Sequence, residues 1–217
     1  MDIHRSLLCR SYPRQACLLL AATLFIGTVH ASPVASAQML ENYRESFKNS
    51  TPPSKYIFVD ANGGDQPSDG PGKIYILDIT AREPASFIYS SEIDRLFKDH
   101  FSVMVDNESL ISTPTADYLV LIMTRPHEYN PKSDHCAAGM GEDRAYLIAI
   151  TDSGVKVLNR NFFSCAGSYR MVHVNEQPGY EIRDYKKGID QAQSVRYLLQ
   201  DGKLIRKENG PYKEKPQ

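Results

Sequence analysis

The hydrophobic positions of the chain form one long apolar run near its start, followed by short apolar segments that polar turns separate. The long run covers residues 16–29, and the stretch before it is basic through Arg5, Arg10 and Arg14. A basic start followed by an apolar run is typical of a secretory signal peptide. A membrane-spanning helix needs about 20 apolar residues, so this shorter run predicts a leader that is removed, leaving no stable membrane anchor.

Two sites for removal of the leader follow the apolar run. The first is Val-His-Ala at residues 29–31, and the second is Ala-Ser-Ala at residues 35–37. Both end in a small residue, and the second matches the A-x-A pattern of cleavage sites better. We therefore predict a cleavable signal peptide over residues 1–37 and a new N-terminus at Gln38, with cleavage after Ala31 as the alternative. Removal of the leader would place the protein in the periplasm or outside the cell.

Two segments of the mature chain show the spacing of amphipathic helices. Residues 38–48 and residues 92–100 each carry apolar side chains at helical intervals. The polar and proline-rich residues 49–53 end the first segment. Ser91 followed by Asp94 is a weak form of the capping box that starts helices. The apolar positions are Met39, Leu40, Tyr43 and Phe47 in the first segment and Ile93, Leu96, Phe97 and Phe101 in the second.

Most of the remaining mature chain has the composition of β-strands joined by short turns. Residues 118–123 are its most continuously apolar segment, which predicts a central strand covered on both faces. Asp201-Gly202 suits a type I′ hairpin turn, and residues 151–154 predict a second hairpin. The predicted strands cover residues 56–59, 74–79, 118–123, 145–150, 155–160, 170–174, 180–183, 195–199 and 204–206.

The order of these elements favours an α+β, β-rich fold. Several strands follow one another through short turns and do not alternate with helices, so we predict a predominantly antiparallel sheet of hairpins. One or two short helices lie near the N-terminal half, and a mainly-β sandwich or a propeller-like fold is the alternative. We predict that residues 38–209 form a single soluble globular domain and that residues 210–217 are a polar C-terminal tail.

The charge of the chain argues against some classes of partner. The whole chain has 25 Lys and Arg and 26 Asp and Glu, and the predicted leader holds three Arg and one Asp. The mature part therefore has 22 basic against 25 acidic residues. Binding to nucleic acid or to an anionic membrane requires clustered basic residues, so we expect neither.

The mature chain keeps two cysteines, Cys136 and Cys165. An even pair of cysteines in an exported protein predicts a disulfide. Pairing about the turn at residues 151–154 places Cys136 opposite Tyr169, so the bond needs slack, which the glycines and alanines of residues 137–141 supply. A catalytic thiol and a metal-ligand role are the alternatives.

Known catalytic motifs are missing from the sequence. It has no G-x-S-x-G, H-E-x-x-H, phosphate-binding loop or G-x-G-x-x-G, so we expect no cofactor. His127 and His135 share a loop, but their spacing matches no usual zinc frame, and we expect no metal there. Residues 60–65 place side-chain oxygens at alternate positions, as calcium-binding loops do. They depart from the EF-hand pattern, however, and the presence of Asp, Asn and Gly there is explained by a turn, so we expect no calcium site.

We therefore predict that the protein is an exported, periplasmic protein-binding domain, of the kind of an inhibitor or immunity protein that binds and neutralises an envelope-acting hydrolase or toxin. In broad build it is similar to periplasmic lysozyme inhibitors and immunity proteins, a likeness of architecture that no motif carries. Loops on a rigid scaffold commonly carry recognition, and tyrosine and arginine are favoured at interfaces. The predicted partner-binding residues lie in two long loops and are Asp60, Asp65, Asp69, Arg125, His127, Glu128 and Tyr129.

Two alternative functions stay open from the sequence. An exported hydrolase would use the cluster of His127, Glu128, Asp134 and His135, which brings acid, base and metal-ligating groups into one loop. An envelope structural or assembly protein would offer the edge of the hairpin at residues 195–206 for strand addition.

Overall fold

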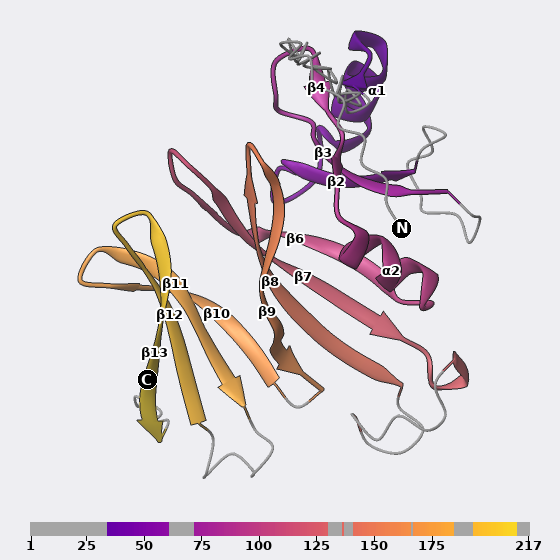
Figure 1. Ribbon diagram of the computed structural model, residues 1–217. Coiled ribbons are helices and arrows are strands. Elements are labelled where there is room, and N and C mark those ends of the chain that lie inside the picture. The colour runs from indigo at the N-terminus through magenta and orange to yellow at the C-terminus, as the bar shows by residue number, and fades with distance from the viewer. Residues whose placement is uncertain are drawn as a thin grey trace, which may run out of the picture. The chain divides into compact units, whose positions relative to one another are not determined.

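Antiparallel strands make up most of the chain, which confirms the predicted β-rich α+β fold. The computed structural model describes residues 34–60, 72–129, 136, 141–165, 167–184 and 193–211 (Figure 1). Each strand pair among them is antiparallel. No helix in this part of the chain is long and apolar enough to cross a membrane.

The described strands form three larger sheets and one small pair. The N-terminal sheet has the order β2-β3-β5, the central sheet β6-β7-β8-β9 and the C-terminal sheet β10-β11-β12-β13, while β1 pairs with β4. The elements are β1 Val34–Ala35, α1 Ala37–Phe47, β2 Tyr56–Asp60, β3 Ile74–Asp78, β4 Ala85–Ser86, β5 Ile88–Tyr89, α2 Ser91–Lys98, β6 Ser102–Ser112, β7 Asp117–Arg125, the 3-10 helix η1 His127–Tyr129, β8 Glu142–Thr151, β9 Gly154–Ser164, β10 Gly167–Val174, β11 Gln177–Asp184, β12 Gln193–Gln200 and β13 Lys203–Pro211.

Both predicted helices are present, with serine caps. The side chain of Ser36 caps α1 by accepting a hydrogen bond from the backbone N–H of Met39. The second helix begins one residue earlier than its sequence pattern predicts, because Ser90 and not Ser91 is the cap and accepts from the N–H of Ile93. Asp94 is buried in α2 and accepts from the N–H of Ile74, so it ties the helix to β3.

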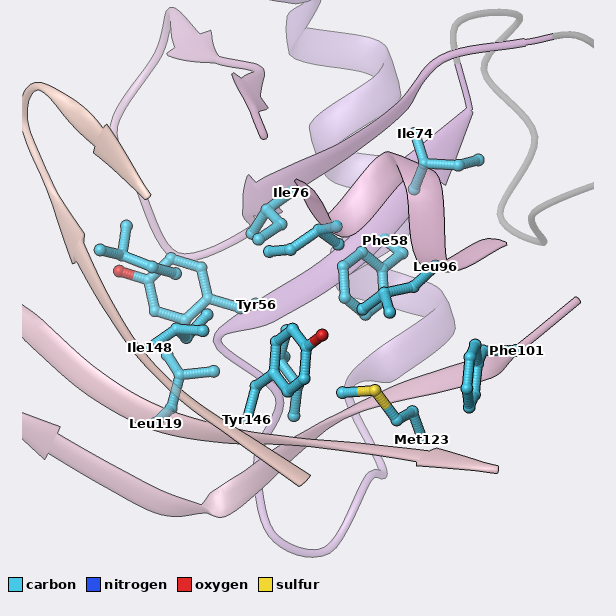
Figure 2. Packing of buried hydrophobic residues seen from close by; sticks show 13 residues of the cluster. Tyr56, Phe58, Ile74, Ile76, Leu96, Phe101, Leu119, Met123, Tyr146 and Ile148 are labelled. Atoms are coloured by element: carbon cyan, nitrogen blue, oxygen red, sulfur yellow. The ribbon is translucent and has the colours of Figure 1, made fainter. Parts of the chain in front are cut away.

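The central sheet is covered on both faces, as the apolar pattern of residues 118–123 predicts. Alternate residues of β7 point to opposite sides, so Leu119, Leu121 and Met123 join one hydrophobic cluster while Tyr118 and Val120 join another. The first cluster includes side chains of β2, β3 and α2, and Figure 2 shows its packing. The second cluster includes side chains of β11 and β12, so the central and C-terminal sheets pack against each other.

Strand β6 was not predicted, because polar residues interrupt its apolar pattern. The register of β6 with β7 shifts between Asp106 and Ile111. At this shift the Ser109 side chain takes the place of backbone hydrogen bonds between the two strands. Its hydroxyl donates to the carbonyl of Asp106 and accepts from the N–H of Val120. Tyr180 of the C-terminal sheet donates to the carbonyl of Ser109 at 2.7 Å. The polar residues thus have partners within a bulged strand.

The hairpins of the C-terminal sheet follow their turn residues. Asp201 and Gly202 have φ values of 49° and 74°, which confirms the predicted positive-φ turn.

Strand β13 is described to Pro211, two residues beyond the domain boundary predicted at residue 209. It lies at one edge of its sheet, where the assembly alternative would need it, but it exposes Lys203 and Lys207. Exposed charges of this kind protect sheet edges from pairing.

Candidate functional site

A hollow of about 500 Å³ lies beside α2 and is lined in part by charged side chains of three strands of the central sheet. We call it the arginine hollow, because one guanidinium comes from α2 and one from each of β7, β8 and β9. Two aromatic rings and two acidic side chains complete most of the lining. The lining residues are Ser91, Glu92, Arg95, Leu96, Asp99, Phe101, Arg125, Arg144, Tyr146 and Arg160.

A buried carboxylate holds two of these guanidiniums in place. Glu142 begins β8, is 1% exposed and forms ion pairs with Arg125 and Arg144. Arg125 and Glu142 are directly opposite each other in the β7–β8 ladder, which places the two side chains side by side. Both guanidiniums also lie over the ring of Phe101, at 4.3 Å for Arg125 and 5.4 Å for Arg144. These contacts fix the floor of the arginine hollow.

The other two guanidiniums differ in their partners. Arg160 forms a two-point ion pair with Glu92, with distances of 2.5 Å and 2.8 Å. Arg95 is exposed, and its side chain has no hydrogen-bond or ion-pair partner among the described residues. The described lining carries four guanidiniums and the carboxylates of Glu92 and Asp99. With the buried Glu142 carboxylate counted, these described groups carry one net positive charge.

The predicted contact residues at and just after the end of β7 lie at or next to this hollow. Arg125 lines it, and His127, Glu128 and Tyr129 form the 3-10 helix η1 two residues later. Tyr129 is 51% exposed and stacks on His100 with ring centroids 4.4 Å apart. The imidazole of His127 is half-buried, and Glu128 is exposed. The structure thus brings four of the seven predicted contact residues together.

A glycine and the disulfide lie close to the end of β7 and the start of β8. Gly141 has a φ of 77°, and a Cβ at this position would lie 2.5 Å from the carbonyl oxygen of Arg125. Only glycine therefore allows this close approach. Cys136 and Cys165 form the predicted disulfide with their Cα atoms 5.2 Å apart, and Cys165 donates its backbone N–H to the carbonyl of Asp143. Register shifts between β8 and β9 supply slack for this bond. Residues 137–140, which the sequence predicts to supply it, lie outside the described residues.

The other predicted contact residues lie elsewhere or outside the described part. Asp60 ends β2 in the N-terminal sheet and is 8% exposed, so it presents little surface to a partner. Asp65 and Asp69 lie outside the described residues, as do Asp134 and His135 of the hydrolase alternative. In the part of the chain that the structure describes, no group of three His, Cys, Asp or Glu side chains could hold a metal ion.

A second hollow, of about 450 Å³, contains a buried ion pair with a structural role. Asp117 begins β7 and accepts hydrogen bonds from Lys55 at 2.6 Å and from the hydroxyl of Tyr56 at 2.5 Å. Burial alone would raise the pKa of the Asp117 carboxyl, but these hydrogen bonds outweigh burial and lower it. Burial and the hydrogen bond to Asp117 raise the pKa of Tyr56. The three side chains therefore join β2 to β7.

Sequence reasoning missed Arg95, Arg144 and Arg160, because they come from three elements that only the folded sheet brings together. Guanidiniums fixed around one cavity recognise a planar oxyanion, above all a carboxylate, by paired hydrogen bonds.

Comparison of the chain with protein-family models, with curated proteins and with solved structures finds no match in any of the three.

Proposed function

We propose that the protein is an exported protein-binding domain of the inhibitor or immunity type, and that the arginine hollow with the adjacent η1 turn is its contact surface. The observation that carries this proposal is the unpaired guanidinium of Arg95 in a hollow with one net positive charge. A carboxylate from an acidic side chain of the partner would neutralise that charge and accept hydrogen bonds from Arg95.

The surroundings of the arginine hollow support a protein partner. Tyrosine and arginine dominate the energetics of protein interfaces, and exposed Tyr129 and Arg95 present both types on neighbouring elements. Tyr129 is already stacked on His100, and Gly141 lies against the backbone of Arg125 and His127 at the base of η1. Binding to such a prearranged surface loses less conformational entropy than binding to a loose one.

Export is part of the same proposal. The basic and apolar start of the chain predicts a leader, and the Cys136–Cys165 disulfide suits an oxidising compartment such as the periplasm or the cell exterior. An inhibitor or immunity protein there would meet a hydrolase or toxin that acts on the envelope.

A pair of arginine variants tests the contact surface. Arg95→Ala removes a guanidinium of the arginine hollow, while Arg82→Ala removes an exposed guanidinium outside it, and neither side chain has a partner in the described part of the chain. Neither change should alter stability by more than about 0.5 kcal/mol. We expect immobilised wild-type and Arg82→Ala proteins to capture the same partner from an envelope extract and Arg95→Ala to capture much less. Equal capture by Arg95→Ala would refute this contact surface.

A further inference from the structure

We infer that the leader is removed after Ala31, so that the mature protein begins at Ser32 and not at Gln38. This inference rests on the export proposed above and chooses between the two sites that the sequence offers. The A-x-A pattern favours residues 35–37, but the folded protein uses these residues together with Val34 in its structure.

The first strand of the fold would be lost if cleavage followed Ala37. Val34 and Ala35 form β1 and pair with Ser86 and Ala85 of β4. Ala35 is 2% exposed and belongs to a hydrophobic cluster under α1 that also contains Leu40. Cleavage after Ala37 would remove β1, leave β4 without its partner strand and uncover this cluster.

The first turn of α1 also depends on a residue before Gln38. The Ser36 hydroxyl accepts from the N–H of Met39 at 3.2 Å, and the Ser36 carbonyl accepts from the N–H of Leu40 at 3.0 Å. Cleavage after Ala37 would remove both acceptors and leave two backbone N–H groups of the first turn without them. It would also place a charged amino terminus on Gln38, where the positive end of the helix dipole disfavours a cation.

Cleavage after Ala31 keeps all of these interactions. Residues 29–31 end in a small residue, as a leader-cleavage site requires, and they lie ahead of β1. The mature protein would then keep its first strand, the cap of its first helix and a neutral first turn.

Intact-mass measurement of the exported protein tests the site. The full precursor is expressed in a Gram-negative host and its product is purified from the periplasm. We expect a mass that begins at Ser32, and a mass that begins at Gln38 would overturn the inference. A product that keeps the whole leader would instead overturn the export on which the inference rests, so the two failures are distinguishable.

A cap variant tests the same point through stability. Ser36→Ala in the precursor should change the mass of the mature protein and lower its Tm by about 2–4 °C, because the cap of α1 is lost. Thr23→Ala, inside the predicted leader, is the matched control and should leave the mature mass and Tm unchanged. If Ser36→Ala also leaves the mature mass unchanged, Ser36 has been removed with the leader and the inference is wrong.

Discussion

Replacing Glu142 by glutamine should destabilise the protein strongly, because it removes one charge that two guanidiniums share. Glu142 is 1% exposed, and the side chains of its partners Arg125 and Arg144 are only 14% and 28% exposed. Neither guanidinium reaches water fully once the carboxylate is neutral. Removing one partner of a buried ion pair costs about 3 to 5 kcal/mol, and we expect about 3 kcal/mol here, because the two arginines keep part of their hydration.

Glu181 supplies the matched control in the C-terminal sheet. It is also 1% exposed and also forms ion pairs with two arginines, but the side chains of Arg170 and Arg196 are 52% and 34% exposed. These guanidiniums can turn to water when the carboxylate is replaced. We therefore expect Glu181→Gln to lower the free energy of unfolding by only about 1 kcal/mol.

Urea unfolding of the oxidised protein at neutral pH and fixed salt measures both changes. The slope of the free energy of unfolding against urea should stay constant, so that the midpoints report stability. Equal losses for the two variants, or a loss below about 1 kcal/mol for Glu142→Gln, would refute the reasoning that burial of the arginines decides the cost.

Three further predictions follow from named contacts. The pKa of Asp117 is lowered in the folded protein, so its contribution to stability is complete above about pH 4 and is lost as the pH falls through the lowered pKa. Urea midpoints between pH 7 and pH 2 should show this loss, and Asp117→Asn should flatten the acid slope. Gly141→Ala should lower the free energy of unfolding by about 1–3 kcal/mol, because its Cβ would meet the carbonyl of Arg125 at a positive φ; calorimetry that finds no loss would contradict this. Reducing the Cys136–Cys165 disulfide should lower stability by about 3–4 kcal/mol, measured as the shift in urea midpoint with and without reductant, and an unchanged midpoint would contradict it.

The sequence predicted those parts of the fold that local pattern controls. The Asp201-Gly202 turn and the apolar run around Leu121 need no distant information, because turn chemistry and continuous hydrophobicity act locally. Strand β6 was not predicted, because Ser109 and its polar neighbours have hydrogen-bond partners only in the folded protein.

The candidate site was predictable only in part, for the same physical reason. Arg125 and Tyr129 stood out because they lie in one loop beside a predicted disulfide. Arg95, Arg144 and Arg160 are dispersed along the chain, and only the packing of α2 against the register of β7, β8 and β9 makes them neighbours. No local sequence pattern identifies these arginines, because they become neighbours only in the folded protein.

The affinity of the captured partner for three forms of the protein tests the central claim most directly. Titration calorimetry compares wild type, Arg95→Ala and Arg82→Ala against the purified partner. Loss of a charged hydrogen bond to a carboxylate should weaken binding by Arg95→Ala about tenfold or more, while Arg82→Ala should bind as the wild type does. Wild-type affinity in Arg95→Ala would contradict the claim that the arginine hollow recognises an acidic group of its partner.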